Sequence, residues 1–305
     1  MIESTSNKYR LAIVVPYYNE RFFRYTLDSL VSQTDKRFVV YIGNDASPDD
    51  PIRLIESYHN AGFSIVYHKF EHNLGGQSLP KQWARCIELT MSEEWIMILG
   101  DDDVLSDNVV GQFYSSLEEI DRHGIHVVNF STQVIDDNGV SVGKKYELPR
   151  ICSSIDCFFR KIDGGGRGSL SEHIFRRISY EKYGFKDYTL GWHSDDMAVM
   201  EFSNFKNIYS IDSATVFVRL GADNISGKTD NEKFKIQASQ QFYEDLLIKY
   251  AQNFTPKQRL VILYAVEYCE SISKKRNPKI KKINIYRSAE GLLGIVRFLK
   301  RSFLG

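Results

Sequence analysis

The feature that most constrains the fold is the alternation of short apolar runs with helix-like segments over the first hundred residues. Leu11–Val15 is a five-residue apolar run, too short for a helix and typical of a strand buried on both faces. Pro16 is expected to end this strand, and the segment after it carries apolar residues at helical spacing. The same order of strand, loop and helix recurs from Phe38 and again from Phe63. The pattern predicts an α/β fold with a mostly parallel sheet and right-handed crossovers.

The second half of the chain is less regular. Residues 126–140 predict a strand and a turn at Asn138-Gly139, and residues 208–221 predict two short strands. The glycine-rich segment 161–170 lacks the phosphate-loop pattern, and we interpret it as a mobile active-site loop or a flexible connector. From about Asn231 onward the apolar spacing is helical.

Composition and charge exclude several classes of protein. The 305 residues contain 39 Lys+Arg and 39 Asp+Glu, so no global field attracts nucleic acid, which we do not expect as a partner. The four cysteines form no CxxC pair and no Cys/His metal spacing, which favours buried reduced thiols. We find no signal-peptide pattern and no run of about 18 apolar residues, so we expect a cytoplasmic protein.

Three polar or acidic loops each follow a predicted strand directly. In parallel α/β sheets the carboxyl ends of the strands meet at one edge, and ligands bind there. We therefore expect these loops to converge on one site. They are "PYYNE" (16–20), "GNDASPDD" (43–50) and "GDDDVLSDN" (100–108).

The third loop holds three consecutive aspartates, Asp101–Asp103. Adjacent carboxylates can bind a hard divalent cation, Mg²⁺ or Mn²⁺, which takes oxygen ligands and leaves positions open for phosphate. The alternative is that Asp103 or Asp107 caps a helix that begins near Asn108. Three carboxylates directly after an apolar strand favour the metal or substrate site.

The other polar positions allow two interpretations each. Asp45 can accept a hydrogen bond from a nucleobase or hydroxyl, or simply belong to a capped turn before a helix. Tyr18 can stack on a base or pack within a turn. Asp195 and Asp196 can supply a general base, or they can be first-turn acidic residues of a helix capped by Ser194. These last two interpretations are compatible.

The motifs in this order resemble those of glycosyltransferase family 2, the inverting nucleotide-sugar transferases of GT-A fold. The resemblance rests on "AIVVPYYNE", "YIGNDASPDD", "ILGDDDVL" and "WHSDDM", and it covers roughly Tyr9–Gly227. It implies a Rossmann-like sheet flanked by helices. We expect a catalytic domain over 1–228, with a nucleotide-binding half to about 107 and an acceptor half from about 108. A helical extension would then occupy 229–305.

The resemblance implies a role for each site residue. Asp45 matches the uracil-binding aspartate, although the loop reads "NDAS" where the family usually has "DDGS". Asp196 matches the catalytic base, with Asp195 in the place of the glutamate of the family's "ED" pair. The remaining roles are metal binding by Asp103 and Asp101, ribose contact by Asp102, phosphate contact by Arg219 in the segment "VRLGADNIS", and nucleotide contacts by Pro16, Tyr18 and Glu20.

The implied reaction moves a sugar from a UDP-sugar to an acceptor hydroxyl with inversion. A bound Mn²⁺ or Mg²⁺ would stabilise the leaving diphosphate, and the carboxylate would accept the proton of the alcohol. The expected acceptor is a glycan or a lipid-linked glycan in bacterial polysaccharide biosynthesis. Two alternatives remain at this point: a nucleotidyltransferase, and a non-catalytic nucleotide- or carbohydrate-binding protein on the same fold.

The C-terminal tail is basic, with "KKRNPKIKK" at 274–282 and "RFLKR" at 297–301. The segment "GLLGIVRFLKRSFL" (291–304), which contains the second run, can form an amphipathic helix. Such a tail is either a solvated helical cap or a peripheral attachment to an anionic membrane, where lipid-linked acceptors would lie. We favour the membrane.

Overall fold

The computed structural model describes residues 9–221, 227, 230–273 and 278–304. Parts of the segment "VRLGADNIS" (222–226) and of the basic tail (274–277) lie outside the described residues. The chain divides into two compact units, Met1–Asp187 with Ser194–Gly227, and Tyr188–His193 with Lys228–Gly305.

The first unit is built on one large mixed sheet with helices packed on it. The strands are β1 (Leu11–Tyr17), β2 (Phe38–Asn44), β3 (Ser64–Lys69), β4 (Trp95–Ile98), β5 (Val104–Leu105), β6 (Val127–Ile135), β7 (Ser141–Tyr146), β8 (Ile151–Ser153), β9 (His173–Arg176) and β10 (Asn207–Arg219). The helices are α1 (Glu20–Val31), α2 (Ile52–Glu56), α3 (Leu79–Ile87), α4 (Val109–Arg122), α5 (Ser154–Ile162), α6 (Arg177–Tyr183) and α7 (Ser194–Phe202). The predicted α/β fold is confirmed.

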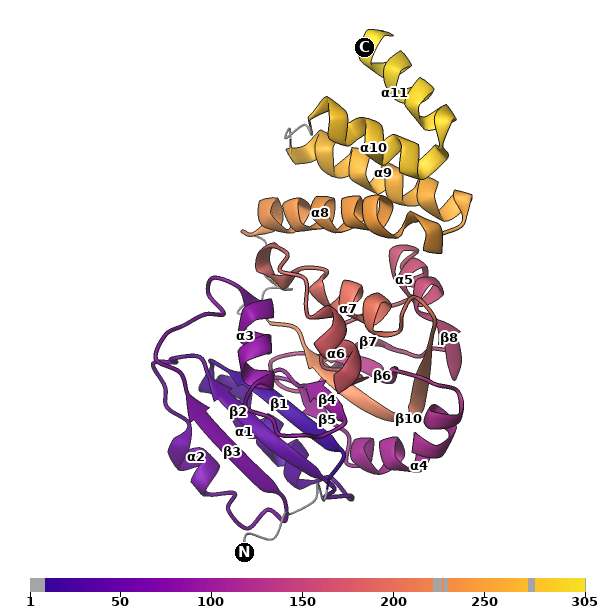
Figure 1. Cartoon of the computed structure of the whole chain (residues 1–305). Helices are drawn as coiled ribbons and strands as arrows, with labels where there is room; N and C mark the ends of the chain where they lie inside the picture. The colour runs from indigo at the N-terminus through magenta and orange to yellow at the C-terminus, as the bar shows by residue number, and fades with distance from the viewer. Residues whose placement is uncertain (1–8, 222–226, 228–229, 274–277, 305) are drawn as a thin grey trace, which may run out of the picture. The chain divides into compact units, whose positions relative to one another are not determined.

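The order of the strands is β3-β2-β1-β4-β9-β6-β10-β5, with β7 paired to β6 and β8 to β10 (Figure 1). The first four neighbours pair in parallel, as the alternating pattern predicts. β9 is antiparallel to both β4 and β6, so a strand from late in the chain joins the two halves of the sheet. The fold therefore brings the loop before β9 next to the end of β4.

Two predicted strand boundaries are wrong. Pro16 does not end β1, because Pro16 and Tyr17 still pair with Gly43 and Asn44 of β2. The pairing of β4 with β1 stops at Val14, so Pro16 lies where β1 has lost one neighbour and its missing N–H costs less.

The segment near the end of the first unit forms one strand, β10, where the sequence predicts two. Its register on β6 shifts between Ile211 and Thr215. The polar residues Asp212 and Ser213 fall at this irregularity, which explains why the sequence suggests a break.

The sheet has an apolar core on each face. Along β1, Leu11, Ile13 and Val15 belong to one core, and Ala12 and Val14 belong to the other. This alternation follows from the two-residue period of a strand. The first core includes residues of α1 and α4, and the second includes residues of α3 and α7.

The second unit is helical. It contains η1 (Thr189–Gly191), α8 (Glu232–Tyr250), η2 (Ala251–Asn253), α9 (Pro256–Ser273), α10 (Lys279–Glu290) and α11 (Leu292–Leu304). The ring of His193 stacks on Phe242 with centroids 4.5 Å apart, and the Tyr188 hydroxyl donates to Asp245 at 2.9 Å. Residues 188–193 thus pack with α8, and His193 is a packing residue.

No helix in the described parts of the chain combines the length and the apolarity needed to cross a bilayer. All four cysteines are free thiols, as expected, but only Cys86 and Cys269 are buried, while Cys152 and Cys157 are half-buried.

Candidate functional site

The carboxyl ends of β1, β2 and β4 meet, as the sequence predicts. The Asp45 N–H donates to the carbonyl of Tyr17 at 2.9 Å, and the Ser47 hydroxyl donates to the carbonyl of Tyr18 at 2.6 Å. The loop after β4 joins them through the carboxylate of Asp101. Three loops that are distant in sequence therefore form one polar surface at the edge of the sheet.

Asp101 links the β4 loop to the β1 loop. Its Oδ2 accepts hydrogen bonds from the backbone N–H groups of Tyr18 at 2.7 Å and Asn19 at 2.8 Å. Burial, with a smaller contribution from the charge of Asp103, raises the pKa of Asp101 to about 6 against the lowering effect of the two N–H donors. Asp101 thus positions the two loops and carries a charge that the site does not fully compensate.

Asp103 is the most buried of the three aspartates, with 5% of its surface exposed. Its Oδ2 accepts from the Ser171 hydroxyl at 2.5 Å, and its Oδ1 accepts from the Arg219 N–H at 2.9 Å. Burial raises the pKa of Asp103 above its usual value in spite of these donors. The capping alternative is wrong, because α4 begins at Val109 and no side chain caps it.

Gly100 allows the carboxylates to approach the backbone closely. A Cβ at this position would lie 2.9 Å from Oδ2 of Asp103 and 3.0 Å from Oδ1 of Asp102. Asp102 is half-buried, and its carbonyl accepts from Nε of Arg219 at 3.1 Å. A side chain at residue 100 would displace the acidic groups, so the glycine is part of the site.

Arg219, at the end of β10, is buried with 3% exposure. Its guanidinium donates to the carbonyls of Asp102 and Asp136 and lies 4.2 Å from the centre of the Phe22 ring. The Arg219 guanidinium is therefore buried next to the acidic loop, and its positive charge partly offsets the negative charge of Asp103.

Asp45, 3% exposed, holds the loop that precedes α3. Its carboxylate accepts from the backbone N–H groups of Leu74 at 2.7 Å and Gly75 at 2.8 Å. It also forms an ion pair with Arg85, whose guanidinium stacks on Phe70. Asp45 thus organises the end of β2, and its carboxylate is already engaged in this structure.

The predicted nucleotide contacts in the β1 loop differ in exposure. Pro16 is half-buried within β1, whereas Tyr18 and Glu20 are exposed, the tyrosine by 50%. Asn19 caps α1 by accepting from the Arg21 N–H. The Tyr18 ring is therefore available to a ligand at this edge of the sheet.

The residues present fit a divalent cation. Burial raises the pKa values of Asp101 and Asp103, with a smaller contribution from Asp103 at Asp101, and a nearby cation would favour the ionised form of both carboxylates. In the described residues, no group of three or more His, Cys, Asp or Glu side chains is arranged to hold a metal by itself. A cation here would need further oxygen ligands, which Mg²⁺ and Mn²⁺ take from phosphate and water.

The second acidic pair lies in the first turn of α7. Lys161 Nζ donates to both carboxylate oxygens of Asp196, at 2.7 and 2.9 Å. The negative charge of Asp195 also raises the pKa of Lys161. Ser194 is not a cap, because it is the first residue of the helix and its hydroxyl donates to the carbonyl of Lys186 at 2.7 Å.

Sequence reasoning missed the groups around this pair. Lys161 and Arg167 flank the glycine run 164–166, and Ser171 and Glu172 follow it. Nη1 of Arg167 is buried without a hydrogen-bond partner. The positive charge of Arg167 has a lowering effect on the pKa of both Asp103 and Glu172. The signal in the sequence was the charged residues on either side of the glycines, which favoured the active-site loop over the plain connector.

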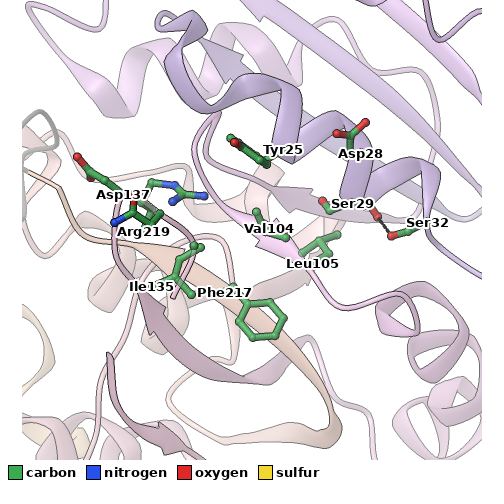
Figure 2. A pocket seen from close by; sticks show the side chains of 12 residues that line it. Tyr25, Asp28, Ser29, Ser32, Val104, Leu105, Ile135, Asp137, Phe217 and Arg219 are labelled. Atoms are coloured by element: carbon green, nitrogen blue, oxygen red, sulfur yellow. Dashed lines mark hydrogen bonds between the residues drawn. The ribbon is translucent and has the colours of Figure 1, made fainter. Parts of the chain in front are cut away.

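Arg219 also lines a cavity of about 490 Å³ (Figure 2). It lies between α1, β5, the β6–β7 turn and the end of β10, and apolar residues such as Leu105 and Phe217 line part of it. Its charged groups are engaged within the protein: Asp28 accepts from Tyr58, Asp137 pairs with Arg21, and Arg219 donates to carbonyls. None of these contacts identifies a ligand.

Comparison with solved structures shows the GT-A fold. Staphylococcus aureus TarS, residues 1–349 in complex with UDP-GlcNAc, superimposes with a TM-score of 0.56 at 15% identity, covering 97% of this chain and 92% of that one. The mannosyltransferase PcManGT from Pyrobaculum calidifontis, in complex with GDP-Man and Mn²⁺, gives 0.57 at 12% identity, covering 98% and 81%. A search of curated proteins finds no match.

The sequence itself matches the model of the family described as "Glycosyl transferase family 2" over residues 12–208. The matched range includes the three converging loops, the glycine-rich loop and the acidic pair of α7. It supports neither the nucleotidyltransferase nor the non-catalytic alternative. The chain belongs to glycosyltransferase family 2 and is a glycosyltransferase.

Proposed function

We propose that the protein transfers a sugar from a UDP-sugar to an acceptor hydroxyl with inversion, and that a divalent cation assists. The observation that carries this proposal is the meeting of Asp101 and Asp103 with the β1 and β2 loops at one edge of the sheet. That edge offers an aromatic face, hydrogen-bonding groups and only partly compensated carboxylates, which suit a base, a ribose and a metal diphosphate in turn.

Within this proposal, the nucleotide binds to the loops after β1 and β2. Tyr18 offers an exposed ring for the base, and Pro16, near the end of β1, and Glu20, at the start of α1, are the further contacts. Asp45 faces the base, with a carboxylate held in place by two backbone N–H donors and Arg85. Asp102 contacts the ribose. The loops after β1, β2 and β4 together thus bind the nucleoside end of the donor.

The diphosphate lies toward Asp103 and Asp101, which would hold Mn²⁺ or Mg²⁺. The cation would supply electrostatic stabilisation of the charge that develops on the leaving diphosphate. Arg219 contributes positive charge from behind the aspartates and fixes Asp103 through its N–H. The donor is therefore held with its leaving group against the acidic loop.

Asp196 accepts the proton. As the acceptor oxygen attacks the anomeric carbon, its proton passes to a carboxylate oxygen of Asp196, and the bond to the diphosphate oxygen breaks with its electron pair. Attack opposite the leaving group inverts the anomeric centre. Asp195 precedes the base and adds negative charge around Lys161.

The acceptor we propose is a glycan or lipid-linked glycan in bacterial polysaccharide biosynthesis, reached at the cytoplasmic face of a membrane. Support comes from the exposed apolar residues and basic residues of α11. TarS and PcManGT are the named neighbours with UDP-GlcNAc and GDP-Man, so the choice between uridine and guanosine nucleotides needs a direct test.

The test is a nucleotide titration followed by thermal unfolding. UDP with Mn²⁺ should raise the unfolding temperature more than UDP alone, and GDP should raise it less. Asp103→Asn should abolish the part that depends on Mn²⁺, whereas Asp107→Asn, an exposed aspartate of the same loop, should not. Indifference of the wild-type protein to UDP and GDP, with and without Mn²⁺, would contradict the proposal.

Asp196→Asn separates binding from chemistry. It should bind UDP as the wild type does and lose about 10²- to 10⁴-fold in transfer rate, the usual contribution of a general base. Release of UDP from a panel of UDP-sugars is the measurement. Full activity of this variant would show that the base is another residue.

A further inference from the structure

Lys161 lies near the end of α5 and binds the proposed base through both carboxylate oxygens. The Asp196 side chain is 10% exposed and that of Lys161 is 31% exposed. Because water screens such a pair less than a surface pair, each charge acts strongly on the other. We propose that Lys161 is a positioning residue, which orients Asp196 and keeps it ionised for proton abstraction. This inference rests on the proposed function.

The glycine-rich loop packs around this pair. A Cβ on Gly168 would lie 3.4 Å from Nζ of Lys161, 3.7 Å from Oδ1 of Asp196 and 3.8 Å from Oε1 of Glu172. The backbone at this point therefore passes among three charged groups. A Cβ on Gly166 would lie 3.1 Å from the backbone nitrogen of Lys161. The loop thus closes on Lys161 and restricts where its ammonium group can lie.

The charges around Asp196 come from several elements. Lys161 lies on α5, Asp195 is its neighbour on α7, Glu172 lies in the loop before β9, and His173 begins β9. Arg167, in the same loop, acts on Glu172. Burial lowers the pKa of Lys161, but Asp196 and Asp195 outweigh it and hold that pKa above its usual value. Lys161 therefore stays cationic throughout the pH range of the enzyme.

Two bonds from one ammonium group fix the plane of the carboxylate. The carboxylate of Asp196 is therefore held in one orientation by Lys161. A cation at this distance also favours the ionised form of the acid. Asp196 can then accept a proton at a lower pH than an unpaired carboxylate at the same buried position.

The first experiment compares Lys161→Met and Lys161→Arg with the wild type. Lys161→Met should reduce kcat by about tenfold to a hundredfold, part of the contribution of a general base, with UDP affinity unchanged. The acid limb of its pH profile should shift to higher pH by about one unit or more, since the lost cation no longer lowers the pKa of Asp196. Lys161→Arg should keep most of the wild-type kcat and most of the wild-type position of the acid limb.

Two further variants serve as controls. Lys144→Met makes the same substitution on an exposed lysine of β7 and should leave the pH profile unchanged. Glu172 is the other buried carboxylate near the pair, so the shift should be measured again in a Glu172→Gln background. A shift that persists there does not come from Glu172.

A double-mutant cycle tests the pair without any donor. Unfolding free energies of Lys161→Met, Asp196→Asn and the double variant should be non-additive at neutral pH, and the coupling should vanish below the titration of the aspartate. If UDP-sugar turns over in the wild type but Lys161→Met leaves kcat and the acid limb unchanged, the inference is wrong while the proposed function stands. If Asp196→Asn is fully active, the base is another residue and the inference fails with that assignment, while transfer from a UDP-sugar stands.

Discussion

At the scale of single residues, the first unit concentrates buried charge around one end of its sheet. Asp45, Asp103, Glu172 and Arg219 are each at most 5% exposed. Burying ionised groups costs free energy unless each finds partners, and here the partners come from distant loops. The sequence alone reveals the aspartates, because they follow strands. It cannot reveal Glu172, whose importance comes only from what the fold packs around it.

Glu172 should make the stability of the protein depend on pH. Burial raises the pKa of Glu172 from 4.5 to about 7, so the folded state binds its proton more tightly than the unfolded state. The stability that it contributes is complete below about pH 4.5 and is lost as the pH rises through about 7. Glu172→Gln keeps the size and the Ser169 contact but does not titrate. Its unfolding temperature relative to wild type should therefore rise between acidic and weakly alkaline pH.

The matched control for that measurement is Glu118→Gln, which changes an exposed glutamate of α4 that pairs with Arg122. Its stability relative to wild type should change little over the same range of pH. A Glu172→Gln variant whose difference from wild type stays constant with pH would show that Glu172 keeps an ordinary pKa.

At the scale of elements, the apolar runs predict the first four strands because each is short. β1, β2 and β4 are largely buried on both faces, whereas β3 lies at the edge of the sheet and has only exposed and half-buried residues. Their ends were harder to predict, since β1 and β2 continue through Pro16 and Asn44 by pairing with each other. The late strands were harder still. β9 is only four residues long, and its place between β4 and β6 depends on pairing across the whole first unit. No local pattern contains that information.

The approach of α3 to β2 depends on Gly43. A Cβ at this position would lie 2.4 Å from Sγ of Cys86 and 3.0 Å from the Phe70 ring, so a neighbour would have to move. Gly43→Ala should therefore destabilise the protein by about 1–3 kcal/mol, the usual cost of overpacking a core. Chemical denaturation monitored by circular dichroism measures it.

Gly111 provides the opposite case within α4. A Cβ there would meet only ordinary contacts, the nearest being Oγ1 of Thr34 at 3.6 Å. Gly111→Ala should stabilise the protein by up to about 1 kcal/mol, because alanine loses less conformational freedom in a helix. If both variants changed stability in the same direction, close packing at Gly43 would not be the cause.

At the scale of the whole molecule, formal charge is balanced, so any attraction to a charged surface must come from a local region. In the second unit, α11 packs Phe298 against Tyr286 of α10, with ring centroids 5.6 Å apart. It leaves Leu292 and Leu293 80% and 76% exposed, and Val296 and Leu299 are exposed as well. These spacings of one, three and three residues place the four side chains on one side of the helix.

An exposed apolar side next to basic residues suits the surface of an anionic membrane, where leucines enter the acyl region and lysines meet the headgroups. The full chain should therefore co-sediment with phosphatidylglycerol vesicles and much less with phosphatidylcholine vesicles. Leu292→Gln with Leu293→Gln should weaken this binding by at least about tenfold, since each leucine loses the free energy of burial. Met91→Gln replaces a side chain of similar exposure, 78%, in the first unit and should bind as wild type does. Equal sedimentation of all three proteins would show that α11 does not contact the membrane.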